Sequence, residues 1–85
     1  MKAESNLRKH GVRFENAMRV FDDTSAIFEQ DRIDETGELR WRVLGRARGT
    51  ALLLVAHVIR QDSGGEVIRL ISARRADRKE RKRYE

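Results

Sequence analysis

The stretch that most constrains the fold of this chain is TALLLVAHVIR, residues 50–60. Apolar side chains occupy successive positions in it, whereas a strand with one face in water alternates between apolar and polar residues. The stretch therefore predicts a central β-strand that is covered on both faces.

Residues 39–47 show the alternation that the central stretch lacks. Trp41 and Val43 point to one side of a strand, and the other side carries Arg40, Arg42, Leu44 and Arg46. This segment predicts a neighbouring strand with one dry face and one wet face.

The rest of the sheet follows from turn residues. The sequence QDSGGE, residues 61–66, is typical of a hairpin connection because glycine pairs accept the backbone angles of tight turns. Residues 67–73 then predict a last strand, so that residues 39–73 form an antiparallel meander. Residues 26–33 are a candidate fourth strand ahead of it.

Two short helices are predicted before the sheet. Residues 1–10 favour a short helix that Gly11 ends. Apolar residues then recur at i, i+3, i+4 and i+7, which places them on one stripe of an amphipathic helix. These residues are Phe14, Ala17, Met18 and Phe21.

A third helix is predicted at the C-terminus, from about residue 78 to the end. Asp77 and Glu80 have the spacing of a capping box, in which each side chain accepts a backbone N–H of the first turn. The expected fold is therefore α+β: two N-terminal helices, a three- to four-stranded antiparallel sheet and a basic C-terminal helix.

Length and composition limit the class of protein. A chain of 85 residues is expected to form one domain, residues 1–85, with a core near the lower limit for independent folding. It contains no cysteine, so neither disulfides nor thiolate metal sites contribute. No apolar run approaches the roughly 20 residues of a membrane span, and no signal-peptide pattern is present, so we expect a cytoplasmic protein.

The charge is unevenly distributed. The net charge is +5, and residues 74–85 carry seven basic and three acidic side chains, a local charge of +4. Residues 22–38 contain seven carboxylates and one arginine. The basic end is either a phosphate-binding surface or a solvated face that aids solubility.

Two runs of sequence carry a resemblance to a known family. KHGVRFENAMRVFDD, residues 9–23, and IRLISARRADRKERKRYE, residues 68–85, resemble the BrnT family of ribonuclease toxins from bacterial type II toxin–antitoxin modules, whose fold is similar to RelE. Arg40, Gly45 and His57 also fall where the family tends to place such residues. Family members usually begin with a short strand carrying a Trp-Asp pair, whereas this sequence begins inside the first helix. Either that strand is missing or this member does without it, and its absence would leave a sheet edge open.

The resemblance implies an endoribonuclease that cuts messenger RNA and arrests translation. It also implies that a BrnA-like antitoxin with a ribbon-helix-helix domain neutralises the toxin. The toxin would then reach operator DNA only indirectly, through that antitoxin. RNA can be cut without a metal or cofactor when its own 2′-hydroxyl attacks the phosphate, provided that a base, an acid and cations are supplied.

Candidates for these roles are present in the chain. His57 and Glu80 are candidate acid–base groups, Tyr84 offers a hydroxyl, and Arg74 and Arg40 offer forked donors to a phosphate. Six further cations are expected to bind RNA: Arg46, Arg48, Arg69, Arg75, Lys79 and Arg81.

Each candidate also has a structural interpretation. His57 is equally a hydrogen-bonded core histidine, Glu80 a helix cap and Tyr84 the apolar anchor of its helix. Trp41 and Met18 are interpreted as core residues rather than base-stacking platforms. A non-catalytic basic module that binds nucleic acid or a partner is the alternative function.

Overall fold

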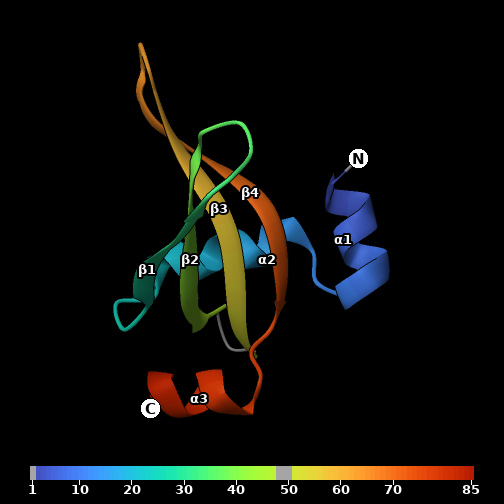
Figure 1. The fold of residues 1–85 in the computed structure, drawn as a ribbon. Helices are drawn as coiled ribbons and strands as arrows, with labels where there is room; N and C mark the ends of the chain where they lie inside the picture. The colour runs from blue at the N-terminus through green and yellow to red at the C-terminus, as the bar shows by residue number, and fades with distance from the viewer. Residues whose placement is uncertain (1, 48–50) are drawn as a thin grey trace.

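The computed structural model describes residues 2–47 and 51–85, and its elements follow the predicted order (Figure 1). They are α1 (Lys2–His10), α2 (Phe14–Met18), the 3₁₀ helix η1 (Arg19–Asp22), β1 (Ile27–Ile33), β2 (Leu39–Arg46), β3 (Leu52–Asp62), β4 (Gly65–Arg75) and α3 (Arg78–Tyr84). The strands form one antiparallel sheet in the order β1-β2-β3-β4. The predicted α+β fold is confirmed, with all four strands in the sheet.

The α2 face of the sheet carries the larger hydrophobic cluster. Val43 of β2 and Val55 of β3 are fully buried there against Ala17 and Val20, which come from α2 and η1. Figure 1 shows α2 running behind the strands. Burial of these side chains holds α2 and η1 on the sheet.

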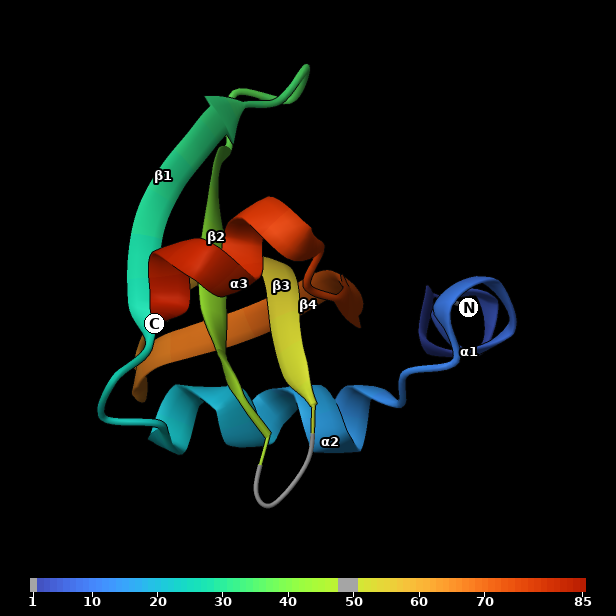
Figure 2. The same cartoon turned by 90° about the horizontal axis from the view of Figure 1, so that it is seen from below.

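The opposite face, called the α3 face below, is covered at one end by the C-terminal helix (Figure 2). Its smaller hydrophobic cluster is formed by leucines of β2 and β3 that alternate along the strands with the residues of the α2 face. These leucines, Leu44, Leu52 and Leu54, pack with Ala76 and Tyr84. The apolar stretch of β3 is therefore covered on both sides, as its sequence predicts.

On the edge of β4, the side chain of Asn6 in α1 forms hydrogen bonds with the backbone of one residue, Ala73. Its amide donates to the carbonyl of Ala73 at 2.9 Å and accepts from the N–H of Ala73 at 2.9 Å, and it also donates to Val12 at 3.0 Å. Asn6 therefore replaces, at one residue, the hydrogen bonds of a neighbouring strand. At Ala73, therefore, a side chain covers this edge of the sheet.

Two details differ from the sequence prediction. The helix predicted over residues 14–21 changes to a 3₁₀ helix at Arg19, and because that helix has about 3.0 residues per turn, Val20 aligns with Ala17. Val20 is fully buried, whereas Met18 is 43% exposed. The interpretation of Met18 as a core residue is therefore wrong. β4 continues to Arg75, so Arg74 lies within the last strand and not after it.

Candidate active site

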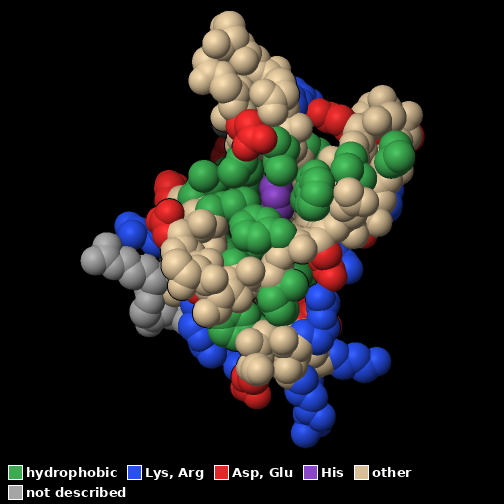
Figure 3. Space-filling model, turned by 90° about the vertical axis from the view of Figure 1, so that its left-hand side faces the viewer, with side chains coloured by type: hydrophobic (Ala, Val, Ile, Leu, Met, Phe, Trp, Pro, Cys, Tyr) green, Lys and Arg blue, Asp and Glu red, His purple; other side chains and the backbone are tan. Residues whose placement is uncertain are grey.

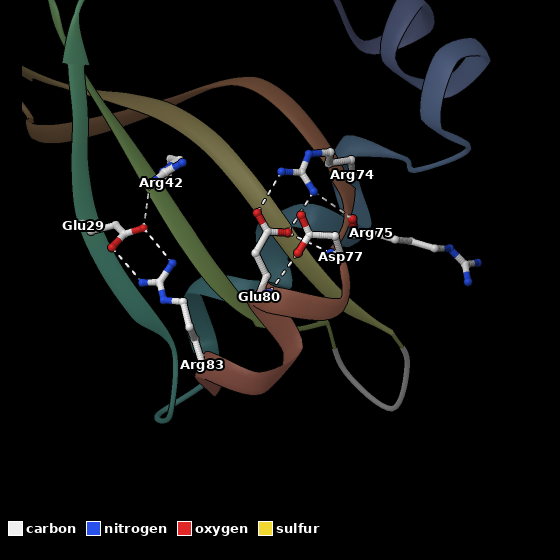
Figure 4. A network of polar contacts seen from close by, with 7 residues as sticks. All are labelled: Glu29, Arg42, Arg74, Arg75, Asp77, Glu80 and Arg83. Carbon is white, nitrogen blue, oxygen red and sulfur yellow. Dashed lines mark hydrogen bonds and ion pairs between the residues drawn. The ribbon is translucent and has the colours of Figure 1, made fainter. Parts of the chain in front are cut away.

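Arg74 and Glu80 form the central pair of the α3 face (Figure 4). Arg74 lies on β4 beside Leu54 of β3, so its side chain points to the face that α3 crosses. Its two terminal nitrogens donate to the two carboxylate oxygens of Glu80, each at 2.9 Å. Such a forked contact fixes both position and orientation.

The same carboxylate completes the predicted capping box. Glu80 Oε1 accepts from the backbone N–H of Asp77 at 2.8 Å, and Asp77 Oδ1 accepts from the N–H of Glu80 at 2.9 Å. The hydrogen bond from Arg74 lowers the pKa of Glu80, the Asp77 N–H and the charges of Arg74 and Arg42 lower it further, and burial opposes them. Glu80 is therefore ionised at neutral pH, as a general base must be.

Glu29 of β1 joins two arginines on this face. Arg83 of α3 donates to both oxygens of Glu29, at 2.7 and 3.1 Å, and Arg42 of β2 donates to Oε1 at 2.9 Å. The hydrogen bond from Arg83 is the main cause of a lowered pKa at Glu29. This carboxylate therefore ties the second half of α3 to β1 and β2, as Figure 4 shows.

Tyr84, the last residue of α3, is held by Asp23. Its hydroxyl donates to Asp23 Oδ2 at 2.6 Å, and the guanidinium of Arg46 lies 5.5 Å from the centre of its ring. The hydrogen bond to Asp23, together with burial, raises the pKa of Tyr84. The phenol is therefore protonated at neutral pH and available as a proton donor.

Asp23 is itself fixed by backbone donors. It accepts from the N–H of Arg46 at 2.8 Å and from the N–H of Ser25 at 2.9 Å. These two bonds and the contact with Tyr84 lower the pKa of Asp23. A Cβ at Gly45 would lie 3.2 Å from Asp23 Oδ2 and 2.8 Å from a Val20 methyl, so the glycine permits this close approach.

Arg40 does not join this cluster. On β2, Arg40 comes just before Trp41, which pairs with His57 of β3, so Arg40 lies beside Val58. Val58 is four residues along β3 from Leu54, and Leu54 is the neighbour of Arg74. At about 3.3 Å per residue this is about 13 Å. Its Nε donates instead to Asp34 at 3.3 Å.

His57 lies on the opposite face. It is fully buried, with its ring perpendicular to those of Phe21 and Phe28 at centroid distances of 4.9 and 6.4 Å. Nδ1 lies 3.2 Å from the carbonyl of Val55, Nε2 has no partner within the described residues, and burial lowers the pKa of the ring. The structure therefore separates His57 from Arg74, Glu80 and Tyr84.

The cations predicted to bind RNA occupy two regions. Lys79 and Arg81 on α3, together with Arg46, lie near the central pair, whereas Arg69 lies near Arg40. Arg75 at the end of β4 pairs with Leu53, and its side chain points away from the central pair (Figure 4). Figure 3 shows blue Lys and Arg side chains gathered at the α3 end, and a hydrophobic area above them. Arg48 lies outside the described residues.

Sequence reasoning missed four members of this site: Asp23, Glu29, Arg42 and Arg83. The signal available was the run of carboxylates in residues 22–38, which the fold lays beside the arginines of β2 and α3.

Two findings concern the described residues as a whole. No group of three or more His, Asp or Glu side chains is arranged to hold a metal, and no helix is long and apolar enough to span a membrane.

On the α3 face, one ionised carboxylate, a forked cation and a protonated phenol therefore lie within a cationic surface, which is suited to acid–base chemistry on a phosphate diester. No curated protein matches the chain. One protein family does match, over residues 1–80, and its description is the ribonuclease toxin BrnT of type II toxin–antitoxin systems. The chain belongs to the BrnT family of ribonuclease toxins of type II toxin–antitoxin systems.

Proposed function

We propose that this toxin cleaves messenger RNA on the α3 face and thereby arrests translation. The observation that carries the proposal is the bidentate Arg74–Glu80 pair, in which a permanent cation and an ionised carboxylate meet at 2.9 Å. Arg74 is 39% exposed at its side chain and can therefore be reached by a phosphate. The family description, a ribonuclease toxin, supports the same reaction class.

The reaction that these residues support is attack by the 2′-hydroxyl of the RNA. Glu80 accepts the 2′-hydroxyl proton, the 2′-oxygen forms a bond to phosphorus, and the bond from phosphorus to the 5′-oxygen breaks. Tyr84 gives its proton to that leaving oxygen, and Arg74 stabilises the charge on the phosphorane. The products are a 2′,3′-cyclic phosphate and a 5′-hydroxyl.

The spacing of the two proton-transfer groups supports this division of roles. Glu80 and Tyr84 are four residues apart on α3, so they lie on the same side of the helix with Cβ atoms roughly 6 Å apart. Tyr84 releases Asp23 when it turns to the leaving oxygen. Arg46 beside the ring then faces the same phosphate.

The cations around this centre would hold the flanking RNA. Arg46, Lys79 and Arg81 form no ion pair with a carboxylate within the described residues, so their charges are available to phosphates. Arg75 is likewise without an ion pair there, but it points away from the centre and would contact only RNA that extends beyond it. Binding through such contacts releases counterions and weakens steeply with salt. Arg48 belongs to the same set by sequence alone.

The decisive experiment is incubation of the purified toxin with a defined RNA, with and without EDTA, followed by analysis of the new ends. We expect cyclic phosphate and 5′-hydroxyl ends in both samples. Cleavage that EDTA abolishes would overturn metal independence. Salt-sensitive binding to an RNA that stays intact at high toxin concentration would instead indicate a non-catalytic basic module.

We further propose that the toxin acts in the bacterial cytoplasm and is neutralised by a BrnA-like antitoxin with a ribbon-helix-helix domain, which alone contacts operator DNA. A partner that binds only the folded toxin must raise its thermal stability, by an amount that grows with the logarithm of the antitoxin concentration. No shift of the unfolding temperature at saturating antitoxin would contradict this choice of partner.

A further inference from the structure

A pocket lies on the α3 face at the end of the sheet that is remote from α3. It has a volume of about 310 Å³ and is formed by the turn between β1 and β2, by β3 and β4, and by the start of α1. Val58, which is 2% exposed, and Ile71 give it apolar lining. The rest is formed by Thr36, by three carboxylates and by four cations, which are Asp34, Glu35, Glu38, Lys2, Arg40, Arg60 and Arg69. The volume is near the lower limit for small-ligand sites, which suits one nucleotide.

The walls of this pocket are held in place by ion pairs. Arg60 donates to both oxygens of Glu38, at 2.7 and 3.1 Å, and Arg40 donates to Asp34 at 3.3 Å. Asp34 also accepts from the N–H groups of Thr36 and Glu38, at 2.9 and 3.0 Å, and from the Thr36 hydroxyl at 2.6 Å. The pocket is therefore formed before any ligand arrives.

Cationic donors remain after these pairs are made. Arg69 and Lys2 line the pocket and form no ion pair or hydrogen bond with a side chain of the described residues. Arg40 uses only its Nε in its ion pair with Asp34. A nucleotide matches this combination, because the face of its base can pack on an apolar lining and its phosphate can bind free guanidinium N–H groups.

The pocket lies on the same face as the proposed reaction centre. Arg40 and Val58 are four residues along the sheet from Leu54 and Arg74, about 13 Å at about 3.3 Å per residue. Arg42 lies on β2 between the pocket and the reaction centre, and it is a cation like Arg40 and Arg74. A single-stranded RNA bound at Arg74 can therefore reach the pocket within a few nucleotides.

We propose that this pocket is a nucleotide subsite for single-stranded RNA, in which a base lies on Val58 and Ile71 and its phosphate contacts Arg69 and Arg40. The subsite holds a nucleotide that is not cleaved, so Arg40 serves binding and not the chemical step. This inference rests on the proposed function, because it takes the RNA to be bound along the α3 face.

The test measures the affinity of two fluorescent RNAs that carry a 2′-deoxy nucleotide at the cleavage position and so cannot react. One is long enough to reach the pocket, and the other ends before it. Arg69→Ala is expected to weaken binding of the long RNA about tenfold, as for loss of one forked contact, and to leave the short RNA unaffected.

Arg8→Ala is the matched control, because it removes the same charge from an exposed position on α1 that does not line the pocket. Equal effects of the two variants, or an equal loss for both RNAs with Arg69→Ala, would overturn the subsite. The readout is binding of uncleavable RNA, so it stays informative if unmodified RNA is not cut, which would overturn only the proposed reaction.

Discussion

The hydroxyl of Tyr84 donates a 2.6 Å hydrogen bond to the carboxylate of Asp23, which joins the end of α3 to the turn before β1. The two residues are 61 positions apart in the sequence. Asp23 is already held by two backbone N–H groups, so the fold sets the direction of the Tyr84 hydroxyl before RNA binds. The position of a proposed catalytic acid therefore depends on a residue that does not take part in the reaction.

Asp23→Asn should move the alkaline limit of activity to lower pH. The negative charge and hydrogen bond of Asp23 raise the pKa of Tyr84, and a proton donor works only below its pKa. Without that charge the phenol loses its proton at lower pH, so kcat/KM should begin to fall sooner as the pH rises. Tyr84 is the sole tyrosine in the chain, so tyrosinate absorbance measures the same pKa directly.

Tyr84→Phe is the control for this titration. It should remove the tyrosinate signal and lower kcat by about 10²-fold or more, as expected for the loss of a general acid. An unchanged alkaline limit in Asp23→Asn, with a shifted tyrosinate titration, would show that Tyr84 is not the acid.

Glu80→Gln should lower kcat by about 10²- to 10⁴-fold, because glutamine cannot take the 2′-hydroxyl proton. Arg74 lowers the pKa of Glu80 below the ordinary value of about 4.3, so the wild-type enzyme should keep its base ionised well into the acid range. Single-turnover cleavage of a labelled RNA measures the chemical step apart from binding.

Asp77→Ala separates the cap from the chemistry. It removes the side-chain hydrogen bond to the Glu80 N–H and should cost about 1 kcal/mol of stability, as for other N-caps. If Glu80 acts only through the capping box, Glu80→Gln should keep most of the activity, because glutamine can accept the same Asp77 N–H, and Asp77→Ala should reduce cleavage more. A much larger loss in Glu80→Gln is the expected result.

Arg83→Ala should loosen α3 from the sheet more than Arg81→Ala, although both remove one charge from the same helix. Arg83 makes a bidentate contact with Glu29, whereas Arg81 makes no ion pair within the described residues. Faster amide hydrogen exchange in α3 of Arg83→Ala alone is the measurement. The difference should shrink at high salt, which screens exposed charges. Equal exchange in both variants would show that the Glu29 contact does not hold the helix.

The sequence predicted the strands and helices well because their signals are local. The unbroken apolar stretch of β3 and the capping box at Asp77 and Glu80 both depend on near neighbours. The exposure of Met18 was missed because the change from an α-helix to a 3₁₀ helix at Arg19 alters the period that the sequence pattern assumes.

The site was predicted less completely, for a physical reason. Arg74, Glu80 and Tyr84 stand out as charged or polar groups near one helix, but the partners Asp23 and Glu29 lie 61 and 54 residues from Tyr84 and Arg83. Such pairs exist only after the sheet has brought β1 beside α3. Residue type and the family resemblance both indicate His57, and only strand register shows that it faces away from Arg74.

His57 should contribute to stability and not to cleavage. Burial lowers its pKa below the ordinary value of about 6.5, so between the two values the unfolded chain binds a proton that the folded chain does not. Stability contributed by the neutral ring is therefore complete above about pH 6.5 and falls as the pH drops towards the lowered pKa.

His57→Asn tests this assignment, because an amide can still donate to the Val55 carbonyl but neither titrates nor packs against Phe21 and Phe28. We expect a stability loss of about 1 to 3 kcal/mol from the missing ring, within the range for core truncations, measured by urea unfolding. The loss of stability that the wild type shows just below pH 6.5 should be smaller in the variant. The kcat of the folded variant should stay within a factor of a few of the wild type, and a fall of about 10²-fold or more would identify His57 as an acid–base catalyst instead.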